Sequence, residues 1–227
     1  KTVLRAATSL TEALMRPIYH RKAERLDAKA ARLREEGALA LTRLRERDPD
    51  QYARVQLTVA RILMGFGGED EKDTRKLLEG SEALSDQAVV DAVAAVMSRD
   101  AFNHRDLQAV DGRLPNGMSV MAMGAHTGCN TVYGSTPPNN PHPYPWMNSL
   151  FQDGATISWL FGESFIRNHA ARSVVPERLC DAILSEEETV MTEQDVFDLT
   201  HFTVALMSDQ EVMELPRVWC VGGDGGM

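Results

Sequence analysis

The sequence predicts an α/β protein in which a parallel sheet with flanking helices follows a helical segment. Three stretches predict it: an Ala-, Leu-, Arg- and Glu-rich segment over residues 2–47, an apolar run at 118–125, and a second apolar run at 216–221. Helical patterns separate the two apolar runs. A strand–helix–strand order of this kind favours parallel strands joined by right-handed crossovers.

Residues 1–115 are predicted to be a helical segment that precedes the sheet. Apolar residues recur at helical spacing through 26–44, and Pro17 is expected to kink or restart this helix. Asp48-Pro49-Asp50 reads as a turn and a helix start, so residues 2–47 and 51–66 are expected to form an antiparallel helical hairpin. Shorter helices are expected at 73–79 and 85–98.

Residues 116–227 are predicted to be the α/β domain. After the strand at 118–125, helices are expected from Asn148 to about residue 171, from Pro176, and from Thr192, which has Asp195 three residues on, close to a capping box. The strand at 216–221 closes the order. Ligands of parallel sheets bind outside the carboxyl ends of the strands. Two unusual segments, at 124–147 and 222–227, come directly after the two predicted strands.

Composition excludes several classes of protein. The 227 residues carry a formal charge of −9, with ten carboxylates and no Lys or Arg between Asp181 and Glu214, so a nucleic-acid partner is not expected. The three cysteines include no CxxC pair, which favours a reducing, cytoplasmic setting. Cys180 and Cys220 lie in helix and strand patterns and are expected to be core residues. No apolar run is long enough to predict a membrane span. The chain lacks an initiator Met and stops at a glycine turn, so we expect it to be incomplete.

Two candidate sites follow the predicted strands. The stretch from Gly124 to Gln152 holds five of the ten prolines, no charged residue, and Cys129, which from the residues alone could be a nucleophile, a metal or cluster ligand, or a buried small side chain. In "GGDGGM", Asp224 could ligate a divalent metal while Gly223 and Gly225 let the backbone approach a pyrophosphate. A plain glycine turn explains the same letters.

The combination of these segments resembles the thiamine-diphosphate domain of the pyruvate:ferredoxin (flavodoxin) oxidoreductases, a 2-oxoacid:acceptor oxidoreductase family. That family has an Ala-Thr-Gly-Cys-Ser-Ser-Ile-Tyr-Gly-Gly element, a Thr/Pro-rich loop, then Pro-Ala-Trp-Ala-Asn-Ser-Leu-Phe-Glu-Asp-Asn-Ala, and later a strand ending in Gly-Gly-Asp-Gly. This chain matches in order at 127–129, 133–134, Pro137, Trp146, 148–151 and 222–225. The resemblance covers about residues 115–227.

The resemblance implies a fold, an activity and a site. The fold is the thiamine-diphosphate-binding α/β fold, and the reaction is coenzyme A-dependent oxidative decarboxylation of a 2-oxoacid, most directly pyruvate, or its reductive reverse. Electrons pass through [4Fe–4S] clusters to ferredoxin or flavodoxin. The resemblance makes Cys129 a cluster ligand and Asp224 a Mg2+ ligand. The implied cofactor-binding residues are Thr127, Gly128, Asn148, Ser149, Leu150, Phe151, Gly223 and Gly225.

Departures from the family pattern leave alternative functions open. No cysteine precedes Cys129, so the paired cluster ligands would lie before Lys1, and Gln152 replaces an acidic residue. No catalytic side chain is assigned. The remaining domains or subunits of the enzyme, expected to be a homo-oligomer, are expected to complete the site. A cluster-free thiamine-diphosphate decarboxylase or synthase and a noncatalytic helical scaffold are the alternatives.

Overall fold

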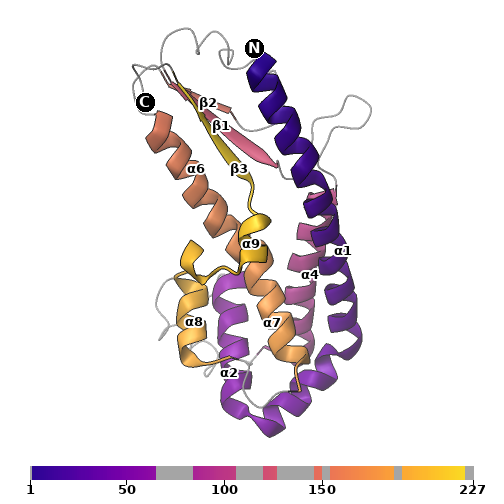
Figure 1. The fold of residues 1–227 in the computed structure, drawn as a ribbon. Coiled ribbons are helices and arrows are strands. Elements are labelled where there is room, and N and C mark those ends of the chain that lie inside the picture. The colour runs from indigo at the N-terminus through magenta and orange to yellow at the C-terminus, as the bar shows by residue number, and fades with distance from the viewer. Residues whose placement is uncertain are drawn as a thin grey trace. The chain divides into compact units, whose positions relative to one another are not determined.

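The computed structural model describes residues 2–64, 84–105, 120–126, 146–149, 154–186 and 191–222. The helices are α1 (Thr2–Arg47), α2 (Pro49–Thr58), η1 (Val59–Leu63), α4 (Asp86–Arg105), α6 (Gly154–His169), η2 (Ala170–Val174), α7 (Val175–Leu184), α8 (Glu193–Thr200), η3 (Val204–Leu206) and α9 (Asp209–Met213) (Figure 1). The strands are β1 (Met121–His126), β2 (Trp146–Ser149) and β3 (Arg217–Val221). The helix expected at 73–79 lies outside the described residues.

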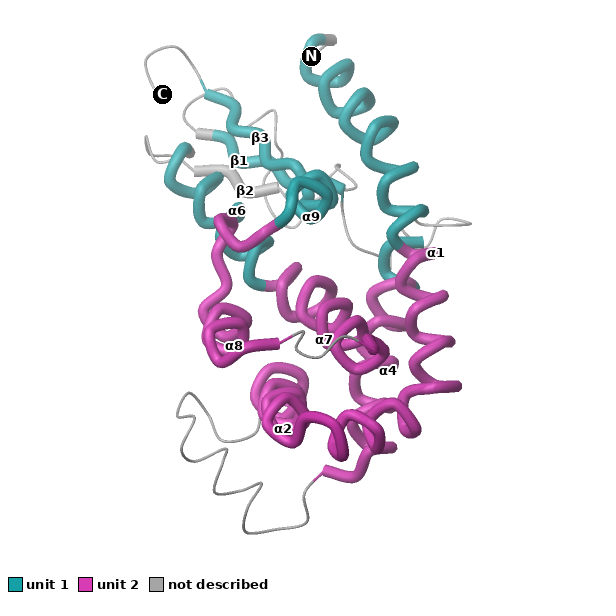
Figure 2. The backbone as a smooth tube through the Cα atoms, turned by 60° about the horizontal axis from the view of Figure 1, so that its bottom comes forward, with its two compact units in different colours: residues 1–22, 102–167, 208–227 teal, residues 23–101, 168–207 magenta. Residues whose placement is uncertain are grey.

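The chain forms two compact units (Figure 2). Unit 1 contains residues 1–22, 102–167 and 208–227, and unit 2 contains residues 23–101 and 168–207. Helices α1 and α4 each run from one unit into the other. Both units therefore draw on chain from before and after residue 115.

Helices alone make the core of unit 2. The apolar residues that recur at helical spacing through 26–44 of α1 are buried, as the sequence predicts, and those of α2, α4, α7 and α8 meet them. The α1 members are Ala23, Leu26, Ala30, Leu33, Leu41 and Leu44, and the α4 members are Val89, Val90, Val93, Ala94, Met97 and Ala101. These stripes bury against one another, and among the described residues no strand contributes to this core.

Side-chain caps set two predicted helix starts. The Asp48 carboxylate accepts a hydrogen bond from the Gln51 backbone N–H at 2.9 Å, and Pro49 follows at the first helical position. Thr192 and Asp195 form a reciprocal capping box at the start of α8. Both starts confirm the sequence prediction, because they depend on local hydrogen bonds.

Helix α1 does not restart at Pro17. It is helical from Thr2 to Arg47 with Pro17 inside it. Proline removes one backbone donor from the helix, but the buried side chains of Met15 and Tyr19 hold the chain on either side of it. Tertiary packing therefore overrides the local signal.

The sheet belongs to unit 1 and has the strand order β2-β1-β3, with both pairings parallel. The two strands expected from the apolar runs thus form, and they are neighbours. One face packs on α1 through a cluster of Met15, Tyr19, Val120, Met121 and Met123, against which Trp219 and Val221 also pack. In register, Met123 lies opposite Trp219 and Ala125 opposite Val221, so these residues share the α1-facing side.

The predicted fold class is wrong. Helices account for most of the described residues, and the sheet among them has three strands of four to six residues. A thiamine-diphosphate-binding α/β fold requires a substantial parallel sheet as its core. In this chain most apolar helix faces are buried by other helices instead.

A second correction concerns Asn148 and Ser149, which were expected to begin a helix. They lie on strand β2, opposite Ala125 and His126 of β1, and the helix begins at Gly154. The pairing with β1 decides the conformation of residues 146–149. No local sequence pattern predicts this strand. The expected helix start at Pro176 is matched by α7, where Pro176 lies in the first turn.

None of the helices in the described part of the chain is both long enough and apolar enough to cross a membrane.

Two glycines in helices give opposite predictions. A Cβ at Gly37 of α1 would lie 2.8 Å from Val90 Cγ2 of α4 and 2.9 Å from Leu33 Cδ1, whereas a Cβ at Gly162 of α6 meets nothing within 4 Å. Gly37→Ala should lower the free energy of unfolding by about 1 kcal/mol, because overpacking exceeds the gain in helix propensity. Gly162→Ala should raise it by about 0.5–1 kcal/mol. Urea unfolding measures both, and equal stabilisation by the two variants would contradict the close packing of α1 on α4.

An ion pair in unit 2 predicts a pH dependence. Arg25 Nε and Nη2 donate to the two Glu177 carboxylate oxygens at 2.9 Å each, and the Glu177 side chain is 12% exposed. Burial by itself would raise the pKa of Glu177, but hydrogen bonds and charge from Arg25 and Lys29 lower it below the ordinary 4.5. A lowered pKa contributes stability above pH 4.5 that is lost as the pH falls through the folded-state value.

Glu177→Gln should therefore lower the free energy of unfolding by about 2 kcal/mol at about pH 6, and the difference from wild type should shrink as the pH falls below the ordinary value. The matched control is Glu36→Gln, since the Arg32–Glu36 pair has side chains 60% and 50% exposed. Its effect should stay within about 0.5 kcal/mol. A pH-independent cost of Glu177→Gln would show that the pair does not titrate as described.

Candidate functional site

The carboxyl ends of the three parallel strands form the first candidate site. Ala125 of β1 is in register with Asn148 of β2 on one side and with Val221 of β3 on the other. All three strands therefore end at the same level of unit 1, about 4.8 Å apart from strand to strand. The edge at the strand carboxyl ends is where ligands of parallel sheets bind.

Each segment with predicted site residues forms or directly follows one of these strand ends. Asn148 and Ser149 are the last residues of β2. Leu150 and Phe151, which follow them, lie outside the described residues, as do Thr127, Gly128 and Cys129 after β1 and Gly223, Asp224 and Gly225 after β3.

Two of these residues follow adjacent strands closely in the sequence. Cys129 comes three residues after His126, the last residue of β1, and Asp224 comes three residues after Val221, the last residue of β3. Strands β1 and β3 pair directly in the sheet.

The segments that form or follow these strand ends contain oxygen donors of the kind that Mg2+ prefers. The sequence supplies the Asp224 carboxylate, the Asn148 amide oxygen and the Ser149 hydroxyl, besides backbone carbonyls. Mg2+ prefers one or two carboxylates completed by phosphate oxygens and water. A diphosphate with its metal is thus chemically compatible with the donor set.

A [4Fe–4S] cluster does not find its ligands in residues 1–227 alone. A cluster takes four thiolates, and the chain has three cysteines. Cys180 is fully buried in the helical core of unit 2, where burial and then the nearby Asp181 charge raise the pKa of its thiol to about 12. Such a thiol is an inert part of the core, as the sequence predicted.

Cys220 differs from its predicted place in the core. It lies on β3 opposite Gly124 and is partly exposed. Trp219 and Val221, its neighbours in β3, pack on the α1 side, so the alternation of a strand puts Cys220 on the other face of the sheet.

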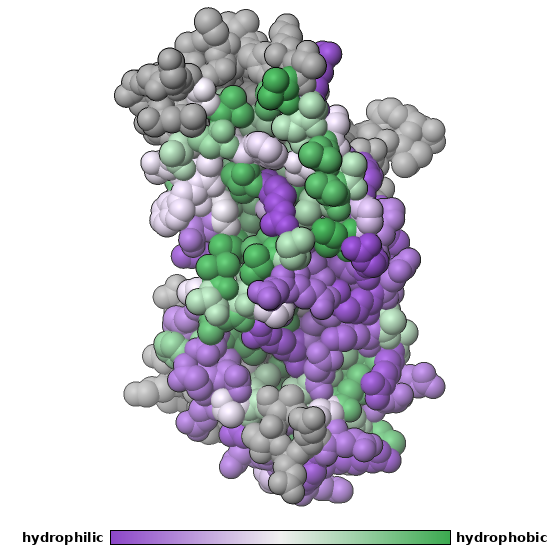
Figure 3. Space-filling view, in the orientation of Figure 1, coloured by the Kyte–Doolittle hydropathy of each residue, from purple (hydrophilic) through white to green (hydrophobic). Residues whose placement is uncertain are grey.

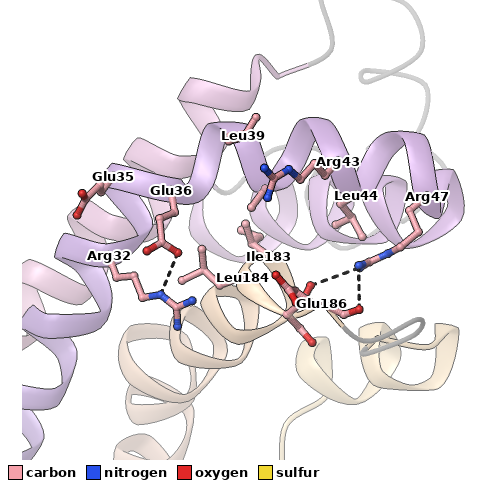
Figure 4. Close-up of a pocket in the computed structure, with 12 residues that line it drawn as sticks. Arg32, Glu35, Glu36, Leu39, Arg43, Leu44, Arg47, Ile183, Leu184 and Glu186 are labelled. Atoms are coloured by element: carbon pink, nitrogen blue, oxygen red, sulfur yellow. Dashed lines mark hydrogen bonds and ion pairs between the residues drawn. The ribbon is translucent and has the colours of Figure 1, made fainter.

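A second candidate is a cavity of about 520 Å3 in unit 2, between α1 and the end of α7 (Figure 4). Its polar lining has three Arg and three Glu residues. Arg32 donates to Glu36 at 3.0 Å, and Arg47 donates to the Glu186 and Ser185 carbonyls at 3.1 and 3.4 Å. The lining is balanced in charge and two of its arginines are already engaged, so we assign it no ligand. The sequence patterns did not indicate this cavity.

Acidic side chains gather at a smaller cavity of about 300 Å3 in unit 2. Asp181, Asp195 and Asp198 line it, but Asp181 is 2.8 Å from Lys29 Nζ and Asp195 caps α8. Within the described ranges, no group of three or more His, Cys, Asp or Glu side chains is arranged to hold a metal ion. This acidic cavity is a set of structural contacts.

Comparisons with protein-family models, with curated proteins and with solved structures found no match to this chain.

The two described cysteines predict different reactivity. Cys220 should react with iodoacetamide in the native protein at about pH 8, whereas Cys180 should stay unmodified until the protein is unfolded, because it is buried and protonated. Peptide mass spectrometry reads each site, and labelling in denaturant is the control. Equal native labelling of both thiols would contradict the burial of Cys180.

Proposed function

We propose that this chain is part of a 2-oxoacid oxidoreductase that acts on pyruvate or a close analogue with thiamine diphosphate, Mg2+ and coenzyme A. One observation carries the proposal: the three segments that resemble the oxidoreductase motifs form or follow the carboxyl ends of three adjacent, level strands. The third of these segments begins about seventy residues after the second in the sequence. Ligands of parallel sheets bind at the carboxyl ends of the strands, and this supports a shared role for the three segments.

The proposal gives each segment a role. Asp224 ligates Mg2+, and Gly223 and Gly225 let the backbone approach the diphosphate. Thr127, Gly128 and the 148–151 segment line the cofactor pocket. Bound thiamine diphosphate supplies the nucleophilic carbon and the electron sink for cleavage beside the keto group. The uncharged 124–152 stretch leaves the charge of the site to the diphosphate and its metal.

The electron-transfer part of the proposal needs more than this chain. Cys129 is assigned as one ligand of a [4Fe–4S] cluster that passes electrons to ferredoxin or flavodoxin, and the other ligands come from outside residues 1–227. The two cysteines among the described residues are free thiols, which supports the proposed reducing, cytoplasmic setting.

Exposed apolar side chains in unit 1 support the proposed further domains or subunits of a homo-oligomer. Val3, Leu10 and Leu14 of α1 are 83%, 60% and 61% exposed and lie on one face of the helix, and Trp159 and Leu160 of α6 are 63% and 54% exposed. Hydrophobic side chains also gather in unit 1 on the face seen in Figure 3. Large contiguous apolar patches on a protein surface mark interaction sites.

The proposal is tested on the natural protein that contains this chain, purified without oxygen. Asp224→Asn should weaken Mg2+-dependent binding of thiamine diphosphate by at least about 100-fold, since even outer contacts of a metal site are worth 10–100-fold. Cys129→Ser should reduce electron transfer to the acceptor while thiamine affinity stays within about twofold. Binding is measured by calorimetry, and iron and acid-labile sulfide are assayed chemically.

Asp209→Asn and Cys220→Ser are the matched controls, and both should behave as wild type. Bound thiamine without iron would overturn the ferredoxin-linked reaction in favour of a cluster-free decarboxylase or synthase. Absence of both thiamine and iron would overturn the proposal that the protein is an enzyme, and would favour a noncatalytic helical scaffold.

A further inference from the structure

The part of α1 that belongs to unit 1 has a second apolar face besides the one that packs on the sheet. On the packed side, Met15 and Tyr19 are buried and the Trp219 Nε1–H donates to the Thr11 hydroxyl at 3.2 Å. At 3.6 residues per turn, the second face occupies a sector of about 120° on another side of the helix. Its residues are Val3, Ala6, Ala7, Leu10, Ala13, Leu14 and Pro17.

The second face is apolar throughout and lies open. Val3, Leu10 and Leu14 are 83%, 60% and 61% exposed, and none of the seven residues is buried. Every other residue between 3 and 17, including each charged one, falls outside the sector. Farther along α1 the same side of the helix carries Arg21 and Glu24, so the apolar face is confined to residues 3–17.

The residue order along this face suits pairing with a second copy of itself. The seven positions are arranged symmetrically about Leu10, so in an antiparallel pair centred there each position faces another position of the same face. Ala6 then lies opposite the partner's Leu14, and Val3 lies opposite the partner's Pro17. Large side chains thereby meet small ones, and the contact is isologous, as a two-fold axis requires.

Charge at the border of the face favours the antiparallel pair. Arg16 borders the face, and Arg21 lies five residues farther along α1. In a parallel pair these two positions are neighbours across the contact, which would bring like charges together. In the antiparallel pair Arg16 lies at the level of the partner's Leu4, about 25 Å along the axis from the partner's Arg21.

A lipid surface fits this face less well than a second copy does. A helix that lies on a membrane carries many Lys and Arg residues on its free polar face. Here the packed side of α1 is covered by the sheet of unit 1, and the chain has a formal charge of −9, which an anionic lipid surface repels.

We propose that residues 3–17 of α1 form the contact between two copies of this chain, which pair antiparallel about a two-fold axis at Leu10. The inference rests on the homo-oligomer of the proposed function, but not on its cofactor chemistry. Three large and four smaller side chains offer less than the roughly 800 Å2 that each partner of a standard interface buries. The dimer is therefore expected to exchange with monomer.

Sedimentation of the natural protein that contains this chain, over a range of concentrations, tests the surface. Leu10→Glu places two carboxylates together at the axis and should raise the dimer Kd at least about 100-fold. Leu39→Glu is the matched control, because Leu39 is an exposed leucine of the same helix, at 57%, outside the face. Its Kd should stay within about twofold of wild type. Circular dichroism should show that both variants keep the helix content and Tm of wild type.

Disulfide formation tests the orientation. Leu10→Cys should oxidise to a covalent dimer, since the axis brings the two side chains together. Val3→Cys alone should not, because its two copies lie about 21 Å apart along an antiparallel pair. A mixture of Val3→Cys and Pro17→Cys should form the mixed dimer. Leu39→Cys measures the background from the natural cysteines.

The outcomes separate this inference from the proposed function. A dimer that survives Leu10→Glu, or a Val3→Cys protein that links to itself, would overturn the inference and leave the homo-oligomer standing. A monomeric wild type would overturn both, whatever the thiamine and iron assays show. A monomer that binds phospholipid vesicles, and loses that binding in Leu10→Glu, would assign the face to lipid instead.

Discussion

The burial of one side of helix α1 is the interaction on which the rest of the described structure depends. Over 46 residues this helix supplies Met15 and Tyr19 to the core of unit 1 and Leu26 and Leu33 to that of unit 2. In proteins, most of the stability of a helix comes from the packing of one face and not from intrinsic propensity. Each core therefore takes buried side chains from α1, and the hydrogen bond lost at Pro17 is small beside that burial.

Charged contacts make the packing on α1 specific. Arg25 and Lys29 lie four residues apart on α1 and meet Glu177 and Asp181, four apart on α7. Two partners at matching spacing fix how far α7 is shifted along α1, which an apolar stripe alone would leave free. Burial alone would lower the pKa of the Lys29 ammonium, yet its hydrogen bond to Asp181 and the two carboxylate charges raise it. The contact is therefore ionic throughout the neutral pH range.

The proposed site lies at the carboxyl ends of the small parallel sheet, in a chain whose described part is mostly helical. It is too small to be the core of an α/β fold, yet it pairs β1, which ends at His126, with β3, which begins at Arg217. A binding site needs convergent segments held on rigid elements, and it does not need a large sheet. The proposed function therefore depends on the strand ends and not on the fold class, which was predicted wrongly.

The sequence by itself determined the features that depend on local chemistry. The caps at Asp48 and Thr192, the buried stripe of α1 and the strands at β1 and β3 follow from side-chain hydrogen bonds and from apolar periodicity. Tertiary structure alone decided that Asn148 and Ser149 are in a strand, that α1 continues through Pro17, and that Thr11 meets Trp219. Those outcomes depend on contacts between residues distant in the chain, whose free energy exceeds the weak local preferences that a pattern can report.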